Sequence, residues 1–583
     1  MKREDFMHAF AIVVALVALL LIAMGSAGAA TYDATGTWSY TTGGCSPVRP
    51  EWVADSGTVE ITQSGDSFTM IMDGEESVSG TIAGAVYTAT HSNAEESETY
   101  VWTLNPPGDS GAGSYTYSCS LGSTTCSFSV NLQGGTSLSG AYNYYVPYYR
   151  GDGEYYSSLA LRNSSDAETA TVTIIVYNQN GSVAQTVSPF TLAAAGQWAA
   201  VLLPKITGGW VHVNSTRKLT GLAWVGQLEG GWPTIMADIG LIGTLSSALT
   251  VPHVAQKRYQ AGGGWDTTVC ICNPNSVAST VSLTYVSPEG TVGSPVILEI
   301  PMKGSIAYGL DDMFPQNDRE GGSVVIAVTP GVAAFALYSD REAASGTCYA
   351  GISASVSETS LRGSYDYYLP YYRSDGDYYS SLALRNASQI LPATVTITVY
   401  NPDGSKAQDV APFAIGARGQ WAAVLSPKIN EGWVLVSSTQ KLSGLAWIGR
   451  LDAAAYPVIM ADISLIGALC TRLIVPHMAQ IRYPAGGGWD TMICLCNPNS
   501  TAVTVSLTCF GTDGSIIGAD SVTLAAMGSE AYELSRIIPG NDRGSGSVTL
   551  DAAQGIASFA LYYDTEAVGG TCYAGIGAVD PDL

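Results

Sequence analysis

The sequence predicts an all-β protein in which an N-terminal β-barrel or meander domain is followed by four tandem β-sandwich modules. Three observations support this fold class. Long stretches recur after 223 or 224 residues, each half holds a weaker duplication, and short segments alternate apolar and polar residues between glycines. The composition agrees, because 65 Gly, 33 Tyr and a charged fraction of only 13% are typical of many short strands joined by tight turns.

Residues 1–30 have the features of a secretory signal peptide. Lys2 and Arg3 precede an apolar run over residues 9–24, and small residues follow at 27–30, where a signal peptidase would cut. The alternative is a retained membrane anchor, but the run is short for a spanning helix, and no later run is long enough. We therefore expect a secreted protein, extracellular or periplasmic, with no membrane span after cleavage of the signal peptide.

Residues 31–140 lack the repeat and are expected to form a separate β domain. Alternating stretches such as residues 58–62 predict its strands, and Gly36-Thr37-Trp38 stands at the first of them. This Gly-x-Trp resembles the start of a lipocalin-like barrel. A meander packed on itself is the alternative.

The rest of the chain is predicted to hold four modules of about one β-sandwich each. Residues 196–202 recur at 419–425, and an Asn stands seven or eight residues upstream of each alternating strand (Asn163, Asn273, Asn386 and Asn497). The alternating strands themselves begin the segments 171–182, 280–291, 394–405 and 504–515. The predicted modules are 141–245, 246–357, 364–468 and 469–583.

The block of residues 270–275, which runs into the alternating strand at 280–283, resembles repeat proteins that bacteria export and whose role is unassigned. More distantly it resembles the sensory rhodopsin transducer family, which has a β-sandwich fold. The likeness covers the core strands of every module. It implies a fold and no functional residue.

Cysteines distinguish the second and fourth modules from the other two. Cysteines two residues apart on a strand share one face, so either Cys of each pair could bond the distant one, and export favours such a disulfide. A hairpin in the first domain could be closed in the same way. Buried free thiols are one alternative, and a zinc site that adds His253 or His477 is another. The disulfide candidates are Cys270, Cys272, Cys348, Cys494, Cys496 and Cys572, with Cys119 and Cys126 in the first domain.

The first and third modules open with clusters of tyrosine. Tyr rings stack on sugars or pack at protein interfaces, and Trp198, Trp265, Trp421 and Trp489 could assist them. Alternatively, the rings cover the junction with a neighbouring module. The candidates for a ligand surface are Tyr148, Tyr149, Tyr155, Tyr156, Tyr371, Tyr372, Tyr378 and Tyr379.

Charge and motifs limit the function. The formal net charge of −24 repels nucleic acid, which leaves an unknown protein or glycan as the expected partner. No nucleophile stands near a base in a recognisable pattern, so we expect no catalytic residue, cofactor or metal. The leading hypothesis is a non-catalytic exported structural or interaction array. The alternatives are a carbohydrate-binding protein that uses its Tyr and Trp clusters, and a hydrolase with its site in the N-terminal domain.

Overall fold

The chain forms two compact units in the computed structural model, and the second comprises Tyr142–Val213 and Arg217–Leu583. Residues 1–30, the predicted signal peptide, lie outside the described residues. Among the residues that are described, no helix has the length and apolar character needed to cross a membrane. The structure describes residues 36–46, 56–64, 67–72, 77–83, 86–92, 96–105, 110–119, 122–133, 142–229, 232–258, 264–314, 318–339, 349–356, 363–426, 428–451, 457–482, 488–539, 542–563 and 573–578.

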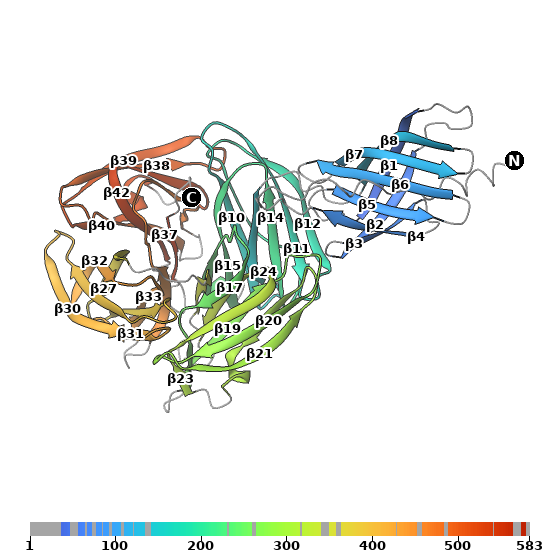
Figure 1. The fold of residues 1–583 in the computed structure, drawn as a ribbon. Helices are drawn as coiled ribbons and strands as arrows, with labels where there is room; N and C mark the ends of the chain where they lie inside the picture. The colour runs from blue at the N-terminus through green and yellow to red at the C-terminus, as the bar shows by residue number, and fades with distance from the viewer. Residues whose placement is uncertain are drawn as a thin grey trace. The chain divides into compact units, whose positions relative to one another are not determined.

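The N-terminal unit is a closed antiparallel barrel (Figure 1, blue). Each strand pairs with the next in sequence, and the first pairs with the last, so the unit is a barrel and not an open meander. Its strands are β1 (Gly36–Ser46), β2 (Ser56–Ser64), β3 (Ser67–Met72), β4 (Ser77–Ala83), β5 (Val86–Ser92), β6 (Glu96–Asn105), β7 (Ser110–Cys119) and β8 (Gly122–Gln133).

The second unit begins with a two-sheet sandwich, which we call module 1. One sheet has the order β12-β11-β14-β9 and the other β13-β10-β15-β16. The strands are β9 (Tyr142–Tyr149), β10 (Tyr155–Asn163), β11 (Ala170–Asn178), β12 (Val183–Leu192), β13 (Gln197–Val201), β14 (Gly209–Ser215), β15 (Leu219–Glu229) and β16 (Trp232–Gly240).

Module 3 repeats this topology with the sheets β30-β29-β32-β27 and β31-β28-β33-β34. Its strands are β27 (Tyr365–Ser374), β28 (Tyr378–Asn386), β29 (Ala393–Tyr400), β30 (Lys406–Ile415), β31 (Gln420–Val424), β32 (Ile429–Ser438), β33 (Leu442–Leu451) and β34 (Pro457–Ser464).

Modules 2 and 4 keep the core strand order of module 1 but add short strands, β18 (Ala255–Arg258), β23 (Asp318–Glu320) and β26 (Ser355–Val356) in module 2 and β36 (Gln480–Arg482) and β41 (Asp542–Arg543) in module 4. A single 17-residue strand, β24 (Ser323–Ser339) or β42 (Ser547–Tyr563), runs through both sheets and replaces the pair β14 and β15. The other elements of module 2 are β17 (Ser246–Val251), β18 (Ala255–Arg258), β19 (Gly264–Cys272), β20 (Ser279–Val286), β21 (Val292–Ile300), β22 (Ser305–Gly309), the 3-10 helix η1 (Leu310–Asp312), β23 (Asp318–Glu320), β25 (Tyr349–Ser353) and β26 (Ser355–Val356).

Module 4 follows the pattern of module 2 around β42. Its other elements are β35 (Cys470–Val475), β36 (Gln480–Arg482), β37 (Gly488–Cys496), β38 (Val503–Phe510), β39 (Ile516–Leu524), β40 (Ser529–Glu533), the 3-10 helix η2 (Leu534–Arg536), β41 (Asp542–Arg543) and β43 (Tyr573–Gly577).

The predicted alternation and turn residues have clear structural roles. On β29, Val395, Ile397 and Val399 are buried while Thr394 and Thr396 are exposed. The four repeated Asn residues are all fully buried, and each side-chain amide donates to backbone carbonyls of nearby loops, as Asn163 does to Glu168 and Ala193. The Asn side chain therefore ties together the connections at one end of each module.

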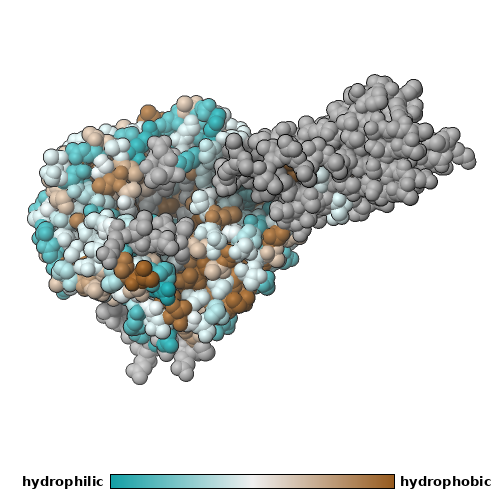
Figure 2. Space-filling model, viewed as in Figure 1, coloured by the Kyte–Doolittle hydropathy of each residue, from teal (hydrophilic) through white to brown (hydrophobic). Residues whose placement is uncertain are grey.

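The four modules close into a ring. The last strands meet, because β16 contacts β25 and β43, and β34 contacts the same two strands. Each of four apolar core clusters also spans one junction: 1–2, 2–3, 3–4 and 4–1. Strands of module 4 (red in Figure 1) therefore lie against module 1 (teal) although they are far apart in sequence. On the face shown in Figure 2, hydrophobic residues form several separate patches among hydrophilic ones.

Candidate functional site

Neighbouring modules of the ring meet at four junctions, which are of two kinds. Each kind occurs twice. At junctions 1–2 and 3–4, a fully buried Trp donates its indole N–H to a backbone carbonyl of the next module. Trp210 donates to Lys303 O at 2.6 Å, and Trp433 donates to Met527 O at 2.7 Å. The contacts of modules 1 and 2 are thus repeated by modules 3 and 4.

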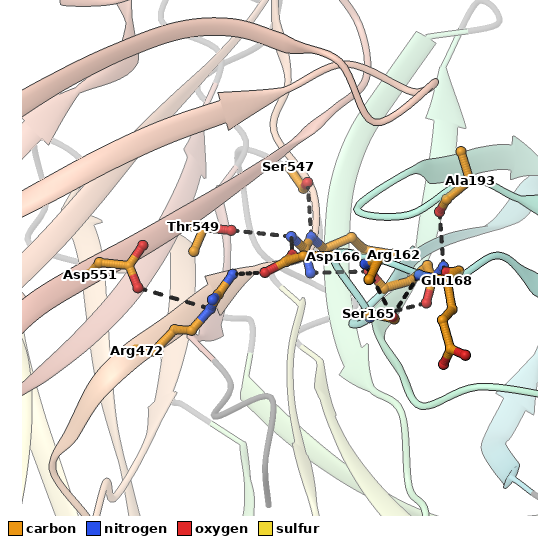
Figure 3. Close-up of polar contacts among 11 residues, drawn as sticks. Arg162, Ser165, Asp166, Glu168, Ala193, Arg472, Ser547, Thr549 and Asp551 are labelled. Atoms are coloured by element: carbon orange, nitrogen blue, oxygen red, sulfur yellow. Dashed lines mark hydrogen bonds and ion pairs between the residues drawn. The ribbon is translucent and has the colours of Figure 1, made fainter.

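Junctions 4–1 and 2–3 are built on a buried arginine. At junction 4–1 the Arg162 guanidinium donates to Ser547 Oγ at 3.2 Å and to Thr549 Oγ1 at 3.1 Å (Figure 3). Burial lowers the pKa of Arg162 to about 10, so the side chain still carries its positive charge at neutral pH. Nearby, Asp166 of module 1 forms an ion pair with Arg472 of module 4. These contacts hold the first and last modules together.

A groove of about 280 Å³ lies between modules 1 and 4. Four aromatic rings, one imidazole and small aliphatic side chains form its walls, and none of the lining residues is an acid, a lysine or an arginine. Cavities that bind small molecules are of this kind, roughly 300–1,000 Å³ and mostly apolar with a few polar groups. The lining residues are Tyr156, Ser158, Ala199, Ala200, Val201, Trp224, His477, Ala479, Ile481, Trp489, Gly544 and Tyr562.

His477 is held in one tautomer. Its Nδ1 lies 2.7 Å from Nε2 of Gln197, and an amide nitrogen can only donate, so Nδ1 accepts the hydrogen bond. Burial lowers the pKa of His477 to about 3, which keeps the imidazole neutral with its proton on Nε2. In the part of the chain that the structure describes, this N–H has no protein acceptor. The lining therefore includes a neutral hydrogen-bond donor.

The aromatic walls are rigidly packed. The Trp224 ring stands edge-on to His477, with centroids 4.8 Å apart, and edge-on to Tyr562, with centroids 5.4 Å apart. The Tyr562 hydroxyl donates to His477 O at 2.7 Å. Such packing fixes the positions of the Trp224 and Tyr562 rings.

Junction 2–3 repeats this constellation with one change. His253 bonds Gln420 at 2.7 Å and packs edge-on to Trp447. Gln420 Nε2 also donates to a backbone carbonyl and its Oε1 accepts from a backbone N–H, which confirms the orientation of the amide. At junction 2–3, Lys257 pairs with Trp265 on the neighbouring strand. The equivalent pair at junction 4–1 is Ile481 with Trp489. Lys257 forms an ion pair with Glu320, so the residue that replaces Ile481 at this junction is charged.

The tyrosine candidates divide between cores and junctions. Tyr149 and Tyr372 are fully buried, and their hydroxyls donate to backbone carbonyls such as Pro204 O and Leu425 O. Tyr371 is also buried, within the core cluster of junction 3–4. These three lie in cores and do not form an open ligand surface.

Another three candidates surround the arginine loops of modules 1 and 3. Tyr148 and Tyr155 line a cavity of about 380 Å³ at junction 1–2. The Arg150 guanidinium lies 3.5 Å from the centre of the Tyr155 ring and pairs with Asp152 at 2.6 Å. Tyr378 has the same place in module 3, under Arg373. The remaining two candidates lie at the other kind of junction, because Tyr156 lines the groove and Tyr379 packs against the core of junction 2–3.

The cysteine geometry argues against the predicted crosslinks in modules 2 and 4. Cys270 and Cys272, like Cys494 and Cys496 in module 4, are buried free thiols. Cys270 stands level with Phe335, whereas Tyr349, the residue after Cys348, stands level with Asp266. That is four residues along the strand, about 13 Å, whereas bonded cysteines need Cα atoms within about 7 Å. Module 4 has the same register around Cys494. Cys348 and Cys572 themselves lie outside the described residues.

The hairpin proposed for the first domain is present, but its register separates the two cysteines. Cys119 pairs with Gly122, while Cys126 stands opposite Tyr115. A bond between Cys119 and Cys126 would require a shift of four residues. The side chains of both cysteines lie outside the described part of the chain.

The zinc alternative finds no support. Across the described residues there is no group of three or more His, Cys, Asp or Glu side chains placed to hold a metal ion. His253 is bonded to Gln420, and Cys270 belongs to the core cluster of junction 1–2. The two residues therefore serve different junctions.

Sequence reasoning singled out Tyr156 and Trp489 of the groove but missed Trp224, His477 as a binding group, and Tyr562. It also missed Asp238 and Asp462, which follow Ala in a motif that modules 1 and 3 share. The presence of a residue type in alternate modules, the signal used for cysteine, would have found both aspartates.

In comparison with known proteins, the sequence matches no family model and no curated protein.

Proposed function

We propose that this chain is a non-catalytic, exported binding protein, in which a ring of β-sandwich modules presents the groove between modules 1 and 4 to a neutral carbohydrate. The observation that carries the proposal is the chemistry of the groove, which combines aromatic walls with the neutral N–H donors of His477 and Trp224. Sugar rings have an apolar C–H face that stacks on aromatic side chains and hydroxyl oxygens that accept hydrogen bonds.

The charge of the protein supports a neutral ligand. With a net charge of −24 the surface disfavours anions, and the groove offers no cationic residue to offset that repulsion. A cationic ligand would lack a carboxylate partner among the lining residues. A volume of about 280 Å³ suits one or two sugar units at the end of a longer chain.

The use of the histidines supports a non-catalytic role. His212, His253 and His477 each bond a side-chain amide and not a hydroxyl or thiol nucleophile. Burial raises the pKa of the thiols of Cys270 and Cys494 far above the usual value, which removes the reactive thiolate. The hydrolase alternative concerns an N-terminal domain in which most side chains lie outside the described residues.

A glycan array tests this function with the mature protein and three matched variants. We expect binding to one or more neutral glycans, weakened at least about tenfold by Trp489→Ala and by Tyr156→Ala, because each substitution removes one stacking face. The control is Trp421→Ala, which deletes a ring that packs on Phe413 of module 3.

Absence of any glycan binding would contradict the proposal. So would equal binding by the wild-type protein and both groove variants, or an equal loss in all three variants. Circular dichroism of each variant confirms that the β-structure is retained, so that a loss of binding can be assigned to the groove.

A further inference from the structure

Four equivalent residues meet where the last strands of the four modules come together. Asp238 stands opposite Trp224 on the neighbouring strand of module 1, and Gly351 stands opposite Leu337 at the same place in module 2. Modules 3 and 4 repeat the pair with Asp462 and Gly575. The ring axis is therefore surrounded by Asp, Gly, Asp and Gly in turn.

Each aspartate bonds a glycine of a different module. Asp238 Oδ1 accepts from the N–H of Gly575 at 2.9 Å, which links module 1 to module 4. Asp462 Oδ1 accepts from the N–H of Gly351 at 2.8 Å, which links module 3 to module 2. The two hydrogen bonds span the same two junctions that Arg162 and its counterpart Arg385 stabilise.

The two aspartates line the same small cavity. It has a volume of about 80 Å³, and the two residues are only 6% and 5% exposed. Across the described residues neither forms an ion pair with a Lys, Arg or His. The charged or titratable groups that face them are each other and the hydroxyls of Tyr562 and Tyr338, and burial raises the pKa of both tyrosines well above the usual value.

Two carboxylates in one buried cavity without a cation cannot both ionise cheaply. Burial is the largest cause that raises the pKa of Asp238, to about 7. Burial, and then the negative charge of Asp238, raises the pKa of Asp462 well above its usual value. The two groups titrate as a pair, as in other sites where carboxyls share a cavity.

We propose that Asp238 and Asp462 retain at least one proton between them in the closed ring, and that loss of this proton loosens the ring by setting two like charges against each other at its axis. The cavity has room for a water to bridge the two groups. The pair therefore acts as a pH-sensitive lock on the junctions that bring module 1 to module 4 and module 2 to module 3.

The direction of the pH dependence follows from linkage. A carboxyl with a raised pKa in the folded state binds its proton more tightly there than in the unfolded chain. The stability it contributes is fully present below the unfolded pKa of about 3.9 and is lost as pH rises through the folded value. We therefore expect the ring to become less stable between pH 6 and 8.5.

Thermal unfolding of the full mature chain between pH 5.5 and 8.5, with a chelator present, tests the lock. The wild-type midpoint should fall by a few degrees as pH rises. Asp462→Asn keeps an oxygen for the Gly351 N–H and removes one charge, so its midpoint should change less with pH. The control is Glu299→Gln, which alters an exposed carboxylate and should keep the wild-type dependence. An unchanged pH dependence in Asp462→Asn would overturn the proposal.

Hydrogen exchange of the unmodified protein covers the case in which the variants misfold. The protection factors of the Gly351 and Gly575 amides should fall over the same pH range, more than those of other core amides; equal changes would contradict the lock. Added calcium or magnesium at pH 8.5 should not restore the midpoint. A restoration that is abolished by Asp462→Asn would mean that the pair holds a divalent cation and not a proton.

Discussion

Arg162 shows how one residue can join parts of the chain that are far apart in sequence. Its guanidinium is fully buried, and its partners Ser547 and Thr549 come from the last module. Removing the Arg162 side chain leaves the hydroxyls of Ser547 and Thr549 without this donor. A buried polar group that loses its partner costs free energy of folding.

We predict that Arg162→Ala lowers the free energy of unfolding by about 2–4 kcal/mol in urea titrations of the full chain. The control, Arg217→Ala, removes an exposed arginine that pairs with Glu168 and should cost at most about 0.5 kcal/mol. Equal losses in the two variants would mean that the contacts of Arg162 do not stabilise the ring.

Single residues also show what the sequence could predict at the site. The sequence pointed to the aromatic residues as a group, because many Tyr and Trp residues in an otherwise small-residue chain need a role. Which aromatic residues are buried and which line the groove depends on packing that the sequence does not reveal. Tyr149 is buried and donates its hydroxyl to Pro204 O, while Tyr156 lines the groove. A neutral, oriented His477 depends on Gln197, which lies 280 residues away.

At the scale of elements, β43 must pass very close to β42. A Cβ added at Gly575 would lie 2.1 Å from Cζ of Phe559, a buried ring of the core at junction 3–4. Gly351 has the same relation to Phe335 in module 2. Gly577, two residues further along β43, has nothing within 4 Å of such an atom.

Gly575→Ala should therefore cost about 1–3 kcal/mol, since the Phe559 ring must move within a close-packed core. Gly577→Ala should be nearly neutral, which makes it a matched control on the same strand. Chemical denaturation of both variants measures the difference. If the two variants were equally stable, the Phe559 ring could not lie against Gly575.

Strands were the most predictable elements, because a half-buried strand leaves a period of two in its sequence. That pattern found β29 and its three counterparts, and glycine marked their turns. It did not separate β24, one continuous strand, from β14 and β15, because both versions place apolar residues in the same two sheets. The register that keeps Cys270 away from β25 was also beyond a local pattern.

At the scale of the whole molecule, the central feature is ring closure. Repeats of about 110 residues predict four similar modules but not whether the first meets the last. Closure is visible only in pairs such as Asp166 with Arg472 and Asp238 with Gly575. The groove and the axial cavity both depend on it, because each is lined by residues of modules 1 and 4.

Zero-length crosslinking tests closure most directly. In an Arg472→Lys variant, a carbodiimide should join position 472 to Asp166 within a monomer, because these two exposed side chains form an ion pair across junction 4–1. Asp551 of the same module lies near Arg472 as well, and its crosslink serves as an internal positive control. Mass spectrometry of the monomer band should therefore find both crosslinked peptides. Detection of the Asp551 crosslink alone would show that modules 1 and 4 do not meet in solution.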